Sequence, residues 1–193
     1  LLVGFFVGLS SGAGVIISQF YGAKHFRNIS QAVHTSIALA LAGGFVLTIL
    51  GIICSKPMMI ATKTPADILQ PSLVYLNIYF TGMIPLFVYN MGSSILRAVG
   101  DSRRPLYILI AGCLTNIVFD LLFVAVFKWG VAGAAWATIL SEVESAVIVM
   151  IILMKTREPY RFEWKHLAFT GNMLREIVRI GFPAGIQSIL YTI

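Results

Sequence analysis

The chain has 193 residues, of which 58% are hydrophobic and 11% are charged, and its net charge is +6. A soluble domain usually carries about a quarter charged residues, so this composition excludes an ordinary soluble globular protein. The basic residues form no clustered face with stacking aromatics, which excludes a nucleic-acid partner, and Cys54 and Cys113 belong to no cluster typical of a metal or redox site.

Apolar stretches follow one another along the chain and are long enough to cross a lipid bilayer. Because lipid offers no partner to backbone polar groups, we expect helices, and long runs without strict alternation exclude a membrane β-barrel. The expected fold is all-α, a polytopic membrane helix bundle with five complete spans and the start of a sixth. The spans cover about residues 1–20, 33–54, 71–96, 105–127, 131–154 and 180–193.

Small residues and proline within these spans predict how they pack. Gly8 and Gly12 in the first span allow another helix backbone to approach closely. Pro85 lies within the third span and is expected to kink it. The sequence begins and ends inside apolar runs, without an initiator methionine or the basic start of a signal peptide. We therefore expect an internal piece of a longer protein.

The distribution of basic residues predicts the orientation in the membrane. All 14 Lys and Arg residues except Lys56, Lys63 and Lys128 lie on the side of the loops at 21–32, 97–104 and 155–173. Loops rich in Lys and Arg stay in the cytoplasm, so we expect these three loops to be cytoplasmic.

Four polar residues interrupt the fourth and fifth spans, namely Asn116, Asp120, Thr138 and Glu142. Within each helix the two members are spaced i, i+4 and therefore share one face. Asp120 and Thr138 are equally far from Trp129 in the sequence, and so are Asn116 and Glu142. An antiparallel hairpin would therefore place these residues in two polar layers at matched depths.

Three interpretations of this polar patch remain open from the residues alone. The oxygens of Asn116, Asp120 and Thr138 are hard ligands that suit a small alkali cation. Alternatively, Asp120 could load and release a proton inside the membrane. The third interpretation is a hydrogen-bonded clasp between helices that has no role in transport. Glu144 faces away from Glu142 and is expected to find its partner on a neighbouring helix.

Five short motifs, in this order and spacing, resemble the MATE family of multidrug and toxic compound extrusion transporters. They are SQFYGA at 18–23, ILRAVGDS at 95–102, NIVFD at 116–120, GVAGAAWAT at 130–138 and GFPA at 181–184. The resemblance implies that the chain corresponds to helices two to six of a twelve-helix fold, plus the beginning of the seventh. Residues 1–173 would then be the amino-terminal lobe without its first helix, and residues 174–193 would begin the second lobe.

The resemblance also implies a function. Such proteins are antiporters of a bacterial-type inner membrane that export cationic or amphiphilic compounds against Na⁺ or H⁺ by alternating access. The implied partners are the lipid bilayer, these small molecules and the remaining half of the same chain, and no cofactor is implied beyond the coupling ion. In part of the family an Asp on the first helix binds a cation together with residues that match Asn116, Asp120 and Thr138.

Two departures from the family pattern concern the same hairpin. Leu121 stands where the family often has proline, and Glu142 stands where glutamine is common, which makes Glu142 an accessory candidate. One alternative is a related flippase for lipid-linked oligosaccharides, but no Lys or Arg lies deep in a span to receive a phosphate. Another is a structural membrane subunit. No nucleophile–base, nucleotide-binding or metal signature occurs, so we do not expect an enzyme.

Overall fold

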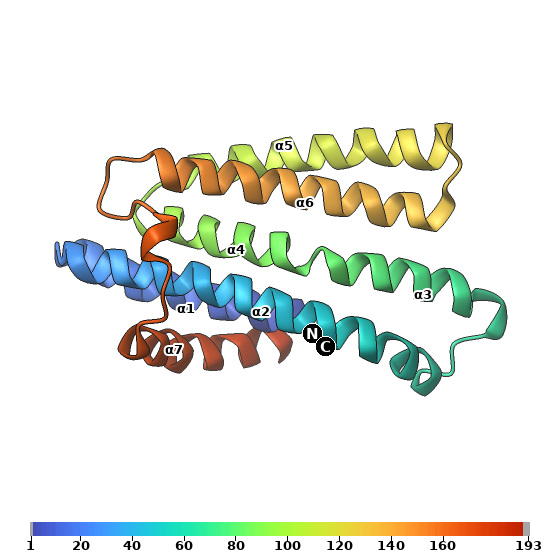
Figure 1. Cartoon of the computed structure of the whole chain (residues 1–193), viewed down its shortest axis with the longest axis horizontal. Coiled ribbons are helices and arrows are strands. Elements are labelled where there is room, and N and C mark those ends of the chain that lie inside the picture. Colours follow the sequence, from blue (N-terminus) through green and yellow to red (C-terminus); the bar gives the residue numbers. More distant parts are fainter. Residues whose placement is uncertain (1, 191–193) are drawn as a thin grey trace.

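The computed structural model describes residues 2–190, which form helices joined by short connections and contain no β-strand. This confirms the all-α prediction. The elements in chain order (Figure 1) are α1 Leu2–Gly22, α2 Phe26–Ala61, α3 Ala66–Thr81, α4 Met83–Ala98, α5 Arg103–Asp120, the π-helical segment η1 Leu121–Val126, α6 Gly130–Lys155, the 3-10 turn η2 Trp164–His166, and α7 Gly171–Leu190.

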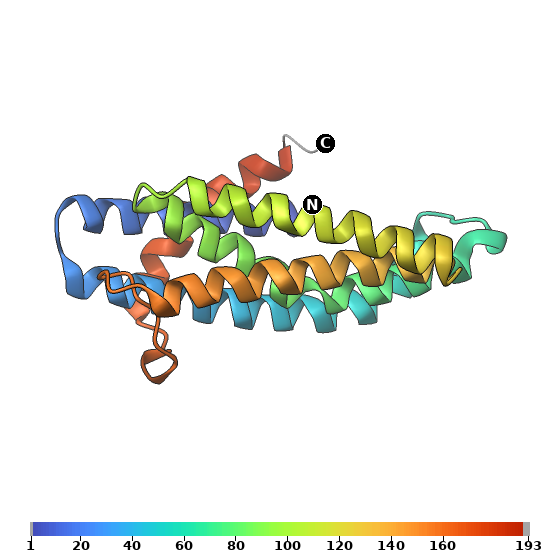
Figure 2. The same cartoon turned by 90° about the horizontal axis from the view of Figure 1, so that it is seen from above.

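Most helices run along one long axis of the molecule (Figures 1 and 2). In Figure 1 the α5–α6 hairpin lies on one side, α3 and α4 lie in the middle, and α1, α2 and α7 lie on the other side. The α2–α3 and α5–α6 turns lie at one end of the bundle, and the α1–α2, α4–α5 and α6–α7 connections lie at the opposite end. The three loops predicted to be cytoplasmic therefore share one end.

The central helix is α4, which packs against α1, α2 and α6. Its apolar positions recur every fourth residue and therefore form one face. The buried side chains of this face are Met83, Phe87, Met91 and Ile95. Phe87 stacks on Phe6 of α1 with the ring centroids 3.9 Å apart. The face of α4 that packs against its neighbours is therefore largely apolar.

The predicted third span is two helices, α3 and α4, which meet at Gly82 with a bend of 45°. Pro85 causes the break, because it has no N–H and its ring clashes with the carbonyl of the preceding turn. The carbonyl of Phe80, next to the break, accepts a hydrogen bond of 2.9 Å from the Thr48 hydroxyl. A neighbouring helix therefore pairs the backbone at the bend, as a membrane requires.

Four helices are long and apolar enough to cross a membrane, and the bent α3–α4 pair raises the number to five within the described residues. Helices α2 and α7 extend furthest beyond their predicted spans. α2 has 36 residues, and α7 begins nine residues before the expected start at 180. Hydropathy marks only the part of a helix that lies in lipid, whereas polar turns continue the same helix into the interface.

Helices α1 and α7 meet backbone to backbone through glycines. A Cβ placed on Gly8 would lie 2.4 Å from the Cα of Gly185, and one placed on Gly12 would lie 2.4 Å from the Cα of Gly181. The two backbones therefore touch. Helix pairs in lipid gain little from the hydrophobic effect, so such close contact supplies packing energy instead.

Replacing Gly12 by valine should separate α1 from α7, because the new side chain would meet the backbone of Gly181. We expect the detergent-purified protein to lose about 1–3 kcal/mol of stability, the usual cost of overpacking. Thermal unfolding would measure this. The matched control is Gly22→Val on the same helix, where nothing lies within 4 Å. Equal melting temperatures for the two variants would contradict the packing argument.

Candidate functional site

The α5–α6 hairpin departs from regular α-helix just after Asp120, the last residue of α5. The six residues of η1 form a π-helical turn, and the N–H of Phe127 donates to the carbonyl of Leu122 over 2.9 Å. The chain then reverses through Lys128 and Gly130, whose φ angles are both 58°. Isolated π-helical turns occur frequently at functional sites, because they rotate the side chains that precede them relative to those that follow.

Three of the four predicted polar residues meet at one cavity between α4, α5 and α6. Asn116, Thr138 and Glu142 line this cavity, whose volume is about 300 Å³. The remaining lining residues, which are apolar or small and polar, are Leu86, Tyr89, Leu109, Gly112, Cys113, Ser141 and Ser145. The spacing of the hairpin predicted this meeting, but it gave no indication that α4 would form the third wall.

Asp120 is not among the residues that line the cavity. It lies one helical turn beyond Asn116 toward the hairpin turn, and its Oδ1 is buried with no hydrogen-bond partner in the described part of the chain. A charged oxygen without a partner is costly inside a membrane. Asp120 is therefore an acid with one buried oxygen that the described residues leave without a partner.

The hydroxyl groups of the site are oriented by their own helix. Thr138 Oγ1 donates to the carbonyl of Ala134 over 3.1 Å, and Ser141 Oγ donates to the carbonyl of Thr138 over 2.7 Å. Each hydroxyl hydrogen is therefore used within α6, and the oxygen lone pairs remain for another partner. Such oxygens accept a cation or a hydrogen-bond donor, which agrees with the ligand types that the sequence suggested.

The carboxylate of Glu142 lies against the bend between α3 and α4. A Cβ placed on Gly82 would lie 2.9 Å from Glu142 Oε2, so the carboxylate lies close to the backbone of Gly82. Glu142 thus contacts the cavity and the broken helix at once. Sequence reasoning missed this contact, because the bend belongs to a distant helix, although Pro85 signalled that a break lies nearby.

Glu144 is placed apart from this site. It does not line the cavity. This agrees with the prediction that Glu144 faces away from Glu142 on α6. A partner on a neighbouring helix was expected, but its Oε2 is buried and makes no hydrogen bond to any described residue. Asp120 and Glu144 are therefore the two carboxylates of the hairpin that do not line the cavity, whereas Glu142 does.

Comparison with known sequences finds the MatE family, whose profile matches residues 1–122. A "Probable multidrug resistance protein YoeA" of Bacillus subtilis is 31% identical over 200 residues, which cover 100% of this chain and 43% of that protein. A "Multidrug export protein MepA" of Staphylococcus aureus is 27% identical over 179 residues, which cover 93% of this chain and 40% of that protein. The chain thus spans less than half the length of these relatives.

Solved structures share the fold. An inward-facing multidrug resistance MATE transporter superposes with a TM-score of 0.90 at 24% identity, covering 97% of this chain and 43% of that chain. A MATE structure in a bent conformation gives a TM-score of 0.91 at 24% identity, covering 97% of this chain and 42% of that chain. The arrangement of all seven helices, including the packing of α7 on α1, therefore occurs in experimentally determined transporters.

The cavity offers a test of its own charge through Cys113, which lines it and is free. On a Cys54→Ser background, a cationic methanethiosulfonate should modify Cys113 roughly tenfold faster than an anionic one, because a cleft lined by one sign of charge concentrates the opposite ion. Modification rates followed by mass spectrometry would check this preference.

Glu142→Gln should remove the charge preference at Cys113. The matched control, Glu144→Gln on the same helix, should keep it, since Glu144 lies outside the cavity. Loss of the preference in Glu144→Gln, or its survival in Glu142→Gln, would contradict the assignment of the cavity's charge to Glu142.

Proposed function

Because this chain belongs to the MatE family, we propose that it forms most of the amino-terminal lobe of a cation-coupled exporter of cationic or amphiphilic compounds. The family is one of membrane transporters, and the matched relatives are named for multidrug resistance and multidrug export. The observation that carries the proposal is the meeting of Asn116, Thr138 and Glu142 at one cavity, next to the unpaired oxygen of Asp120.

The coupling site consists of Asp120, Asn116 and Thr138. Asp120 supplies the charge, Asn116 an amide oxygen and Thr138 a hydroxyl oxygen whose hydrogen is already used within α6. These are ligands for Na⁺, and Asp120 alone suffices for H⁺. Glu142 is accessory, and it extends the acidic character of the site into the cavity, where a cationic substrate would dock.

Transport follows from alternating access between two lobes. Cation or proton binding at Asp120 changes how α5 packs on α6, because Asp120 ends α5 directly before the π-helical segment η1. The bend at Gly82 and the proline of α7, Pro183, are the flexible points. Residues 1–173 belong to the first lobe in this scheme, and residues 174–193 begin the second, so the boundary falls within the first turn of α7.

The cavity composition argues against the flippase alternative. A lipid-linked oligosaccharide carries phosphate, which proteins bind with Lys or Arg. No Lys or Arg lines the cavity at the hairpin, and Glu142 would repel a phosphate. A structural subunit stays the alternative that only a transport measurement separates from an exporter.

Replacing Asp120 by asparagine in the full-length protein should abolish cation-coupled drug efflux while leaving membrane insertion intact, because the variant keeps the shape and loses the charge. Efflux of a fluorescent cationic dye from inverted vesicles, driven by a Na⁺ or a proton gradient, would measure the effect. The control is Glu144→Gln, which removes another partly buried carboxylate that is not one of the three proposed ligands. Unchanged efflux and ion dependence in Asp120→Asn would rule out the coupling role, and a loss of expression alone would favour a structural subunit.

We also propose a cytoplasmic location for the loops at 21–32, 97–104 and 155–173 in a bacterial-type inner membrane. Alkaline phosphatase fused after Lys63 or Gly130 should be active in a Gram-negative host, because the enzyme needs disulfides that form in the periplasm. Fusions after Gly100 or Thr156 should be inactive. The reverse pattern of activity would invert the orientation.

A further inference from the structure

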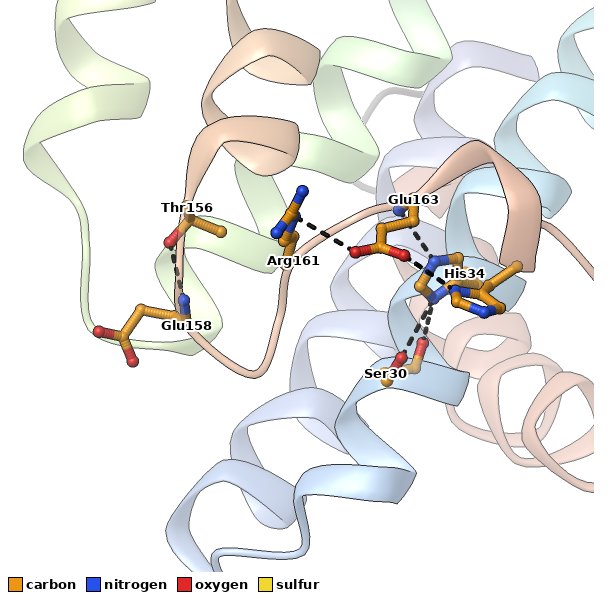
Figure 3. Close-up of polar contacts among 7 residues, drawn as sticks. Ser30, His34, Thr156, Glu158, Arg161 and Glu163 are labelled. Carbon is orange, nitrogen blue, oxygen red and sulfur yellow. Dashed lines mark hydrogen bonds and ion pairs between the residues drawn. The ribbon is translucent and has the colours of Figure 1, made fainter.

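The connection between α6 and α7, residues 156–170, folds back over the first turns of α2 (Figure 3). Apart from the short turn η2 it has no regular structure, yet Phe162 within it is only 1% exposed. Two consecutive residues of α2 hold its backbone. Thr35 Oγ1 accepts from the N–H of Thr170 over 3.2 Å, and His34 Nε2 accepts from the N–H of Glu163 over 3.0 Å.

The hydrogen bonds of His34 determine its protonation state. Nδ1 lies 2.7 Å from the carbonyl oxygen of Ser30, and a carbonyl only accepts, so Nδ1 must carry a hydrogen. Nε2 faces the N–H of Glu163, which only donates, so Nε2 must be bare. The ring is 3% exposed and stacks on Phe162 with centroids 5.1 Å apart. The observed fold therefore requires the neutral imidazole with its hydrogen on Nδ1.

We propose that His34 is the positioning residue that docks residues 156–170, and with them the start of α7, onto α2, and that protonation of its ring releases them. A second hydrogen on Nε2 would point at the N–H of Glu163, so the bond would become a contact between two donors. Histidine is the side chain whose ordinary charge change lies near physiological pH. The contact is therefore sensitive to the pH on the side of the membrane where the connection lies, which is the cytoplasm in the orientation proposed above.

Charged groups near His34 include some that oppose a positive charge on its ring and one that compensates it. Arg27 and His34, both on α2, line a second cavity of about 490 Å³. The positive charge of Arg27 opposes a further positive charge on the His34 ring. On the connection, His166 meets the His34 ring edge to face at 5.9 Å, and the Glu163 carboxylate pairs with His166 and Arg161 at 3.2 and 3.4 Å. Just before α7, Ala168 and Thr170 also line this cavity, and neither carries a charge. His166 is thus the competing titratable group, and any test must separate it from His34.

Docking of this connection matters because it is the covalent link to α7. α7 contacts α1 along a glycine seam, so the position of its first turn relative to α2 determines how that seam closes. The inference concerns the position of the connection and not the ion or the substrate. It holds or fails independently of the exporter function proposed above.

Hydrogen exchange of the full-length protein in lipid nanodiscs tests the proposal. After correction for intrinsic rates, peptides covering residues 158–170 should lose protection roughly tenfold between about pH 8 and about pH 5.5, the ratio that loss of about one hydrogen bond implies. His34→Gln, which keeps an acceptor but cannot be protonated, should stay protected at both pH values. His34→Ala should exchange fast at both.

His166→Gln is the matched control and should keep the pH response of the wild type. Equal protection of the wild type at both pH values would overturn the proposal. A pH response that persists in His34→Gln, or one that disappears only in His166→Gln, would overturn it as well, because the sensor would then be another group. Should His34→Ala fail to fold, the comparison of His34→Gln with the wild type decides alone.

Discussion

Inside a bilayer no water is available to pair a polar group, and most features of this bundle follow from that constraint. The break at Gly82 exists because Pro85 removes a helix hydrogen bond, and the Thr48 hydroxyl meets the carbonyl of Phe80 beside it. Ser94 likewise donates to the carbonyl of Ser10 over 2.6 Å between α4 and α1. Among the described residues the buried side-chain oxygens without a partner are the hydroxyls of Ser36 and Ser93 and one carboxylate oxygen each of Asp120 and Glu144. The carboxylates are the costlier pair, because a charge inside a membrane needs a partner, water or a proton.

The same constraint explains why the helices touch where they do. Lipid tails are as apolar as leucine, so burying another leucine between helices contributes little, and close backbone contact contributes more. α1 and α7 meet through Gly8, Gly12, Gly181 and Gly185, whereas most apolar side chains of α5 are exposed on the described bundle. Gly112 approaches the Ser145 hydroxyl, which lets α5 lie near α6 without a bulky side chain between them. The hairpin that carries the candidate site is therefore held by small residues, and it stays open enough to enclose a cavity.

Sequence patterns predicted the helices and much of the site, because hydropathy and i, i+4 spacing are properties of single helices. The meeting of Asn116, Thr138 and Glu142 followed from the hairpin alone. The position of Asp120 off the cavity did not, because the spacing gives the shared face of Asn116 and Asp120 but not how far along α5 the cavity extends. The π-helical segment that begins at Leu121 was not predicted either, since no periodicity reveals it. The contact of Glu142 with Gly82 and the docking of Glu163 on His34 join residues about 60 and 129 positions apart, so they depend on tertiary packing that a local pattern does not contain.

Asp120 and Glu142 lie apart, and this separation has a consequence for ion coupling under the proposed function. Asn116 and Thr138 line the cavity with Glu142, whereas Asp120 lies one turn away from it. Under that function, a cation bound jointly by Asp120, Asn116 and Thr138 would draw the two neutral ligands toward Asp120. A cationic substrate beside Glu142 would be best solvated when the oxygens of Asn116 and Thr138 face the cavity. The two cations then compete for the same pair of oxygens, and a ligand shifts an equilibrium only through such a difference in affinity between states. Mutually exclusive use of Asn116 and Thr138 would give the hairpin two alternative arrangements, which is the minimum that antiport demands.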